Sequence, residues 1–186
     1  MKNYLKYFVK EIIPITVGVL VALLINTCSQ NLKDQRYVDK IFSSMTKELT
    51  ETDKDITVKL VRQRSLIDTL DFYLEDNKVS LLDVVEKAGG IFVPSIKTTA
   101  WNAISSSKIE LIDYDKISAL SNIEVGKRYL NNKSERLANF FYSNTNDTGK
   151  QKKEFMKMLI SDIIREEVTS QKNIQEILND NYIIRK

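Results

Sequence analysis

The chemistry open to this sequence is limited by the reactive side chains that it carries. Its 186 residues include no histidine and a single cysteine, Cys28. This composition excludes Ser-His-Asp and Cys-His triads, histidine-ligated zinc or haem, and an internal disulfide. The remaining reactive groups are carboxylates, lysines and hydroxyls, and from these we expect neither an enzyme active site nor a bound cofactor.

The densest acidic group is the stretch Glu48, Glu51, Asp53 and Asp55. Glu51 and Asp55 are four residues apart, so they share one face of a helix. A site for a hard cation needs more oxygens, converging from a loop, and a straight helix cannot curl round an ion. We therefore expect a solvated face and no metal.

A basic cluster begins the last predicted helix, with Lys150, Lys152, Lys153 and Lys157. The helix dipole disfavours cations at a helix N-terminus, so the pattern predicts solvent exposure. The functional alternative is a surface for an anionic lipid headgroup or an acidic partner.

Trp101 follows Thr98 and Thr99 and precedes the serine turn 105–107. A lone tryptophan on a short helix is typically the packing anchor of a small core, and the alternative is an interaction or ligand surface. Ser105–Ser107 and Lys108 lack the one-turn spacing and the oxyanion cradle of a Ser-Lys hydrolase.

The elements that position these residues are predicted to be helices. Only 5 glycines and 2 prolines occur, so there are few residues suited to tight turns. Helical spacing of apolar residues predicts one helix from about Glu11 to Glu75. Its heptad seam turns polar at Thr52, Lys59 and Gln63, which favours packing within the chain over a coiled-coil dimer. The apolar positions are Val38, Ile41, Phe42, Met45, Leu49, Ile56, Leu60, Ile67, Leu70 and Leu74.

The remainder predicts shorter elements and then two longer helices. Ser80 should cap a helix over 81–87 that Gly89 and Gly90 end. A loop over 91–96, a helix capped by Thr98 or Thr99, and an extended stretch over 109–112 should follow. We then expect a helix from Asp113 or Asp115 through Phe141, a turn over 144–149, and a last helix carrying Phe155, Leu159, Ile163, Ile174 and Leu178. The predicted fold is all-α: one N-terminal transmembrane helix runs into a long helix, followed by a small helical bundle domain.

An uncharged run from Ile12 to Ile25 predicts the membrane helix, which we bound at residues 12–28. This is at the short end of what a bilayer core requires. Pro14 should lie in the first turn, where its missing N–H is harmless, so that the helix begins near Glu11. The expected anchor residues are Ile12, Pro14, Gly18, Leu20, Ala22, Leu23, Ile25 and Asn26.

The basic residues Lys2, Lys6 and Lys10 precede this run, and a short basic tail is usually retained in the cytoplasm. We therefore expect residues 1–11 to be a cytoplasmic tail and residues 29–186 to form an extracytoplasmic helical domain. The predicted location is the inner membrane of a bacterium, with a periplasmic domain. The alternatives are a buried core helix and a cleaved leader that leaves a lipoprotein anchored at Cys28.

The first 30 residues also resemble a family of uncharacterised bacterial single-pass membrane proteins, a domain of unknown function. The resemblance rests on Glu11-Ile12, on Gly18–Leu23 and on Ile25-Asn26. It is looser over residues 98–112, and it implies architecture and compartment but no activity. The chain departs from the pattern at Pro14, Leu24, Thr27 and Cys28; members have Trp where Cys28 stands, which argues against lipidation.

Three functions compete. The first is a non-enzymatic interaction or scaffold protein of the cell envelope, anchored in the lipid bilayer and bound to a protein partner or to further copies of itself. The second is a sensory or accessory subunit that signals to a partner through its membrane helix. The third is an enzyme that acts on envelope material with carboxylates alone. Nucleic acid is not expected, because the net charge of +3 is dispersed among both signs.

Overall fold

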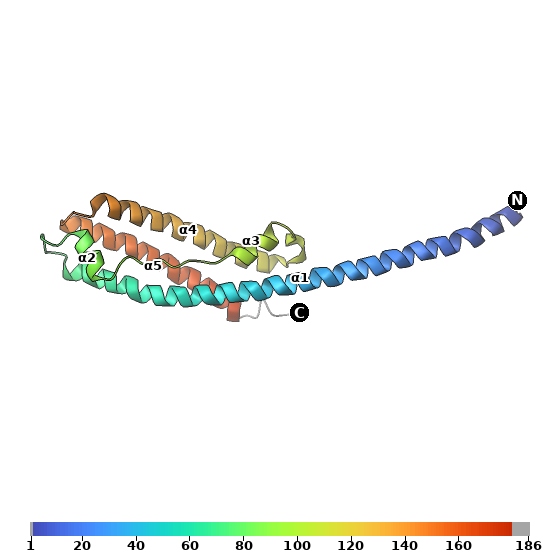
Figure 1. Cartoon of the computed structure of the whole chain (residues 1–186), viewed down its shortest axis with the longest axis horizontal. Helices are drawn as coiled ribbons and strands as arrows, with labels where there is room; N and C mark the ends of the chain where they lie inside the picture. Colours follow the sequence, from blue (N-terminus) through green and yellow to red (C-terminus); the bar gives the residue numbers. More distant parts are fainter. Residues whose placement is uncertain (1, 180–186) are drawn as a thin grey trace. The chain divides into compact units, whose positions relative to one another are not determined.

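The computed structural model describes residues 2–179, with side chains from residue 8. These residues form helices and no strand, so the all-α prediction is confirmed (Figure 1). The elements are α1 (Lys2–Phe72), α2 (Leu81–Lys87), α3 (Thr99–Ser105), the 3-10 helix η1 (Ile109–Leu111), α4 (Tyr114–Asn144) and α5 (Lys150–Asn179).

The chain divides into two compact units, Met1–Ile41 and Phe42–Lys186. The first unit is the N-terminal part of α1, and each of its residues from 8 to 33 is exposed. The predicted start near Glu11 is wrong, because α1 begins at Lys2 and Pro14 lies inside it. No breaker interrupts residues 2–13, and an internal proline removes only one backbone hydrogen bond from an otherwise intact helix.

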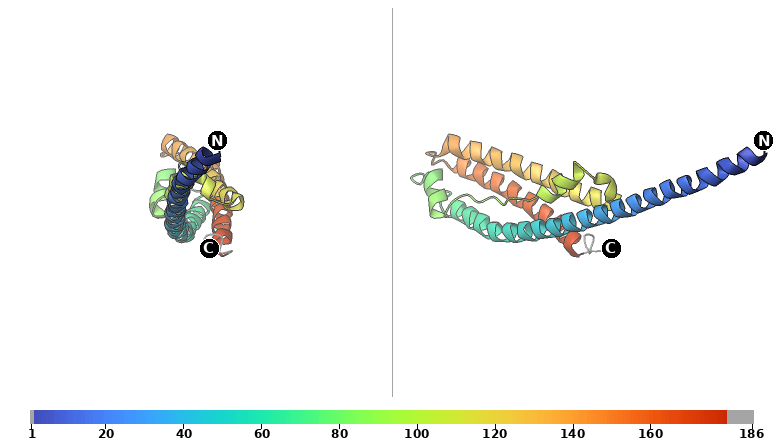
Figure 2. Two further views of the ribbon diagram at one scale, coloured as in Figure 1. Left: turned by 90° about the vertical axis from the view of Figure 1, so that its right-hand side faces the viewer. Right: turned by 45° about the vertical axis from the view of Figure 1, so that its right-hand side comes forward.

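The second unit is a bundle in which the C-terminal part of α1 packs with α4 and α5. The turn 145–149 joins α4 to α5, and these two helices lie side by side (Figure 2). Its apolar core has the helical spacing predicted, with Leu66 buried in place of Ile67 on α1. Phe155 is exposed, and the other predicted apolar positions that are only half-buried are Val38, Ile41, Leu74, Ile117, Phe141 and Leu178. The buried apolar residues of the long helices are Phe42, Met45, Leu49, Ile56, Leu60, Leu66 and Leu70 on α1, Leu120, Ile123, Leu130 and Leu137 on α4, and Met156, Leu159, Ile160, Ile163, Ile174 and Ile177 on α5.

Two of the three polar residues that interrupt the α1 seam lie inside this core, and the third, Lys59, is half-buried. Thr52 is fully buried and Gln63 is 2% exposed. The Thr52 hydroxyl donates to the Glu48 carbonyl at 2.8 Å, and the Gln63 amide donates to groups of other elements. Packing within the chain, predicted from the polar seam, is thereby confirmed for the described residues.

The short elements are largely those predicted. Ser80 and Asp83 form a capping box at the start of α2, and Gly89 and Gly90 have positive φ values of 84° and 116° after its end. The extended stretch predicted at 109–112 is wrong, because residues 109–111 form η1. Its closing hydrogen bond runs from the Ile112 N–H to the Ile109 carbonyl at 3.0 Å.

Candidate functional site: an extended strap, its groove and the apolar helix

Residues 91–98 form a non-helical segment, the strap, that leads from α2 to α3 (Figure 1). Phe92 contacts Gln63 and Lys97 contacts Thr52, two positions of α1 that lie roughly 16 Å apart at about 1.5 Å per residue. The five residue steps from Phe92 to Lys97 cover that distance, so this part of the strap is almost as extended as a β-strand. Its burial alternates accordingly: Pro94, Ile96 and Thr98 are buried, whereas the residues between them are exposed.

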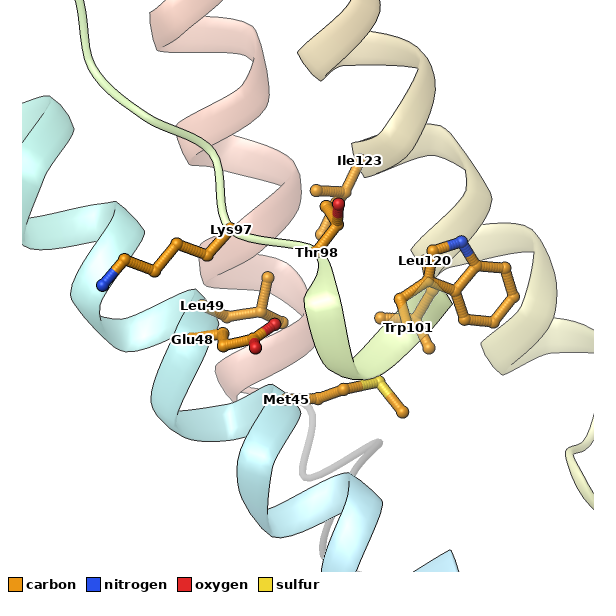
Figure 3. A pocket seen from close by; sticks show the side chains of 8 residues that line it. All are labelled: Met45, Glu48, Leu49, Lys97, Thr98, Trp101, Leu120 and Ile123. Carbon is orange, nitrogen blue, oxygen red and sulfur yellow. The ribbon is translucent and has the colours of Figure 1, made fainter. Parts of the chain in front are cut away.

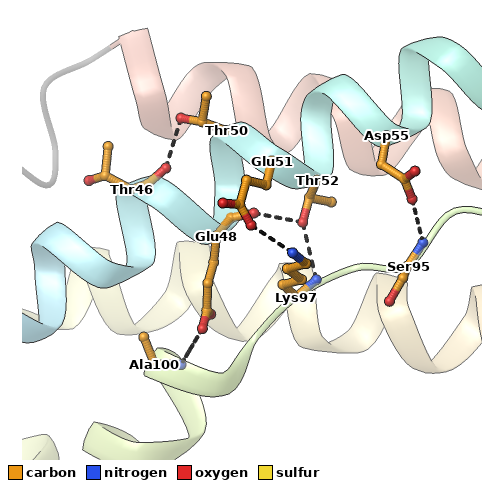
Figure 4. A network of polar contacts seen from close by, with 9 residues as sticks. All are labelled: Thr46, Glu48, Thr50, Glu51, Thr52, Asp55, Ser95, Lys97 and Ala100. Atoms are coloured by element: carbon orange, nitrogen blue, oxygen red, sulfur yellow. Dashed lines mark hydrogen bonds and ion pairs between the residues drawn. The ribbon is translucent and has the colours of Figure 1, made fainter.

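The acidic stretch of α1 holds this strap (Figure 4). Its four acids are half-exposed, so the predicted solvated face is only partly right. The Ser95 N–H donates to Asp55 at 3.0 Å, and the Lys97 N–H donates to the Thr52 hydroxyl at 3.1 Å. The Lys97 ammonium also pairs with Glu51 at 2.6 Å. An extended segment has unpaired backbone donors along its edge, and side chains one helical turn apart on α1 satisfy them.

Glu48 supplies the cap of α3 that was predicted from Thr98. Thr98 occupies the N-cap position, but its side chain makes no capping bond. Instead the Glu48 carboxylate accepts the Ala100 N–H at 3.1 and 3.3 Å, and the Thr98 hydroxyl accepts a hydrogen bond from Lys127 at 2.7 Å. Asp53, the remaining acid, accepts from Gln171 and Gln175 of α5 at 3.1 and 2.9 Å.

These contacts perturb two of the carboxyl groups. The hydrogen bond and the charge of Lys97 lower the pKa of Glu51. Burial opposes ionisation of Asp55, but the Ser95 N–H and Lys59 outweigh it and lower the pKa of Asp55. Both groups are therefore ionised acceptors at neutral pH. Within the described residues, no group of acidic or cysteine side chains is arranged to hold a metal ion.

A second connection to the strap runs through the core. The Gln63 amide nitrogen donates to the Phe92 carbonyl at 2.8 Å and to the buried Glu167 carboxyl of α5 at 2.6 Å. The Arg62 guanidinium, on an exposed side chain, lies 4.6 Å from the centre of the Phe92 ring. Three elements that are distant in sequence thus meet at one amide group.

Beside this connection lies a groove of about 450 Å³ between the strap, α2 and α4. The hydroxyls of Ser134 and Tyr142 are the only side-chain polar groups among its lining residues, which are Val85, Ile91, Val93, Ser134, Leu137, Ala138, Phe141 and Tyr142. The backbone N–H groups of residues 91–93 donate no hydrogen bond within the described part of the chain. The groove is therefore an apolar depression bordered by strap residues whose N–H groups have no acceptor among the described residues.

Trp101 is a core residue, as the sequence predicted. It is 7% exposed and packs where α3 meets Met45 and Leu49 of α1 and Leu120 and Ile123 of α4 (Figure 3). The space left among these side chains is only about 10 Å³, too small for a ligand. The interaction surface suggested for Trp101 is therefore not available at its ring.

Three of the four lysines of the predicted basic surface contact the end of α1 or the residues just after it, and Lys150 also stays exposed as predicted. Lys153 is fully buried, so its predicted exposure is wrong, and its ammonium donates to the carbonyls of Tyr73 at 2.8 Å and Asp76 at 2.7 Å. Lys150 pairs with Glu75, and Lys157 contacts both carboxylate oxygens of Asp71 at 2.5 and 2.7 Å. Lys152 lies 5.7 Å from the Phe140 ring centre. The carbonyl end of α1 has negative partial charge and no basic residue in its own last turn, so the lysines of α5 complement it.

The first unit contains the predicted anchor. The helix is long and apolar enough to cross a membrane: its most apolar 18-residue window has a mean hydropathy of 2.3 and no buried residue. All the predicted anchor residues are exposed, from Ile12 and Pro14 to Asn26, and Cys28 is an exposed free thiol. Gly18 has no neighbouring atom within 4 Å of the position of a Cβ.

Two features of the strap were visible in the sequence but were not used. The alternation over 94–98 is typical of a strand, and the acids at 48, 51 and 55 recur at helical spacing opposite it. Compared with known proteins, the chain matches no protein-family model, no curated protein and no solved structure. The resemblance of its N-terminal residues to a family of unknown function therefore stays a prediction.

Proposed function

We propose that this chain is a non-enzymatic, single-pass membrane protein whose helical domain binds a protein partner in the groove beside the strap. The occupant would be an extended, apolar segment of that partner. The observation that carries this proposal is an apolar groove bordered by residues 91–93, whose N–H groups donate no hydrogen bond to any described residue.

The chemistry of the groove favours a peptide over a lipid. An extended peptide can accept hydrogen bonds from an exposed strand-like edge while alternate side chains enter an apolar groove. An acyl chain would fill the apolar space but could accept no hydrogen bond from a strap N–H group. We assign no reaction to this site, because the Ser134 hydroxyl donates to the Leu130 carbonyl at 2.7 Å and has no base beside it.

The proposed location is the bacterial inner membrane, with residues 12–28 in the bilayer and the domain in the periplasm. Its support is the exposed apolar stretch of α1 and the basic residues Lys2, Lys6 and Lys10 that precede it. A phosphatase fused to the C-terminus should be active in this orientation. The intact mass of the membrane-extracted protein should include residues 1–27, whereas a mass that begins at a modified Cys28 would establish the lipoprotein alternative.

The contact itself is tested with a photo-crosslinking amino acid at Val93 in the full chain, expressed in its own membrane. Val61 of α1, which is 67% exposed and lies outside the groove, is the matched control position. We expect one protein to crosslink at Val93 and not at Val61, through a segment with alternate apolar residues. A synthetic peptide of that segment should then bind the purified full chain, and Val93→Lys should abolish binding while Val61→Lys preserves it. Equal crosslinking at both positions, or crosslinks to lipid alone, would contradict the proposal.

A second function, a sensory or accessory subunit, is favoured by one observation. α1 is a single helix from Lys2 to Phe72, so the residues proposed for the membrane and the residues that hold the strap belong to one element. In that case occupation of the groove should change the environment of a probe on Cys28. If the probe signal is unchanged when the crosslinked segment saturates the groove, the sensory function is contradicted and the scaffold function is supported.

A further inference from the structure

Glu167 of α5 is an acid in the core of the second unit with an incomplete set of hydrogen bonds. Its side chain is fully buried, and its Oε1 atom accepts from the Gln63 amide at 2.6 Å. Its other oxygen, Oε2, has no hydrogen-bond partner among the described residues, and neither has Oε1 of Gln63. The two unpartnered atoms thus belong to the two side chains that already share a hydrogen bond.

An ionised carboxylate cannot satisfy both atoms, because a carboxylate and an amide oxygen are acceptors only. A neutral carboxyl group can, since its hydroxyl is a donor for the amide oxygen of Gln63. Carboxylic acid and amide then form a closed pair, with N–H to one carboxyl oxygen and O–H to the amide oxygen. The second N–H of Gln63 remains on the Phe92 carbonyl, at 2.8 Å.

We infer that Glu167 is a proton-dependent switch for the strap: its neutral form fixes Gln63 on the Phe92 carbonyl, and its ionisation releases that contact. In the ionised form, the carboxylate faces the lone pairs of the Gln63 oxygen in the core, where an unpaired charge is costly. Rotation of Gln63 or entry of water relieves this repulsion, and either one weakens the hydrogen bond to Phe92. The inference concerns the strap alone and stands whether or not a partner occupies the groove.

The charged surroundings of Glu167 leave it without a strong counter-ion. Burial raises the pKa of Glu167 to about 7, with the Gln63 hydrogen bond and Lys59 acting against that rise and Asp55 adding to it. Lys59 itself pairs with Asp55 at 3.0 Å. Arg62, on the same helix, lies over the Phe92 ring.

The charged side chains of the other elements near this part of α5 also contact groups other than Glu167. On α4, Lys127 donates to Thr98 and Lys133 pairs with Glu166 at 2.9 Å. Glu124 of α4 has one buried oxygen without a hydrogen-bond partner among the described residues. On the strap, Lys97 pairs with Glu51. The chain has no histidine, so no imidazole titrates in the same pH range as Glu167.

The test is hydrogen–deuterium exchange of the full chain in detergent micelles at pH 6 and pH 8, corrected for the intrinsic pH dependence of exchange. The readout is the protection of the strap amides, including those of Ser95 and Lys97. We expect protection in the wild type to fall on the order of tenfold between the two pH values, as the neutral fraction of Glu167 falls. Glu167→Gln should give equal protection at both, because an amide can form the same closed pair with Gln63 at any pH. Glu154→Gln, an exposed acid of α5, should behave as the wild type.

Strap protection that is independent of pH in the wild type, or a pH dependence that persists in Glu167→Gln, would overturn the inference. A second measurement guards against a variant that does not fold. Infrared spectra of the wild-type full chain should contain the C=O band of a protonated carboxylic acid at pH 6 and lose most of it at pH 8. Absence of that band at pH 6 would equally overturn the inference.

Discussion

The two parts of α1 have the same backbone conformation but opposite relations to their surroundings. From residue 8 to residue 33 no side chain is buried, although the apolar residues Val19, Leu20 and Val21 stand in direct succession. From Phe42 to Leu70 apolar residues recur on one side, and the acids that hold the strap occupy the neighbouring side. An apolar circumference requires an apolar solvent, whereas an apolar stripe requires a protein core.

The difference between the two parts of α1 is tested most directly by placing charged residues on each part. Leu20→Arg combined with Leu23→Arg should cost about 5 to 7 kcal/mol of insertion free energy, since one arginine at a membrane-helix centre costs about 2.5 to 3.5 kcal/mol. Val58→Arg combined with Val61→Arg is the matched control, because both valines are more than half exposed on the second unit. Carbonate extraction should release the first variant from membranes and retain the control. Retention of both would mean that residues 12–28 are not the anchor.

The second unit should be most sensitive at its aromatic anchor. Trp101→Ala removes a side chain packed against α1 and α4 and should lower the free energy of unfolding by about 3 to 5 kcal/mol, a large share of the roughly 5 to 15 kcal/mol of one domain. Because Trp101 is the sole tryptophan, unfolding is followed by circular dichroism. Tyr114→Ala, at a position that is 80% exposed, is the control and should melt as the wild type. A similar melting point for Trp101→Ala would place the tryptophan on a surface.

The free energy of unfolding of the second unit should also depend on pH, because Glu167 lies in its core. An unfolded Glu167 loses its proton near 4.5, whereas the folded form retains it to about 7. The folded state therefore binds more protons between these values, so the stability is full below pH 4.5 and falls by about 3 kcal/mol as the pH rises through 7. Urea unfolding of the full chain, followed by Trp101 fluorescence from pH 5 to 8, measures this slope. Glu167→Gln should remove the slope, and a stability that instead rises with pH would reverse the assignment.

How much of this could be predicted depended on whether a residue's environment is set locally. The capping box at Ser80 and the turns at Gly89, Gly90 and 145–149 follow from neighbouring residues, and these predictions agree with the structure. The start of α1 was misplaced, because a proline inside a helix was interpreted as a first-turn residue.

The candidate site was predicted poorly, because its contacts join residues distant in sequence. Glu48 and Ala100 are 52 positions apart, and Lys153 and Tyr73 are 80 positions apart. The sequence analysis assigned charged residues to solvent by default. In the structure, Glu48, Asp55 and Lys153 instead form hydrogen bonds with backbone groups at helix ends and along the strap. The unpaired backbone groups of a helix end or an extended segment need hydrogen-bond partners, and a charged side chain from a distant part of the sequence can supply them.

The smallest effect distinguishes two acids of the same stretch. Glu48→Ala should lower the free energy of unfolding by about 0.5 to 2 kcal/mol, the usual cost of losing an N-terminal cap, because its carboxylate is the side-chain acceptor for the first turn of α3. Glu51→Ala should cost less, since the ion pair with Lys97 is exposed on both sides and the Lys97 N–H remains bonded to Thr52. Salt sharpens the distinction: in 1 M sodium chloride the effect of Glu51→Ala should disappear, because exposed ion pairs are screened. The effect of Glu48→Ala should persist, since a backbone N–H loses its acceptor at any ionic strength. Equal effects that salt abolishes together would mean that Glu48 acts only through its charge and that α3 needs no cap from α1.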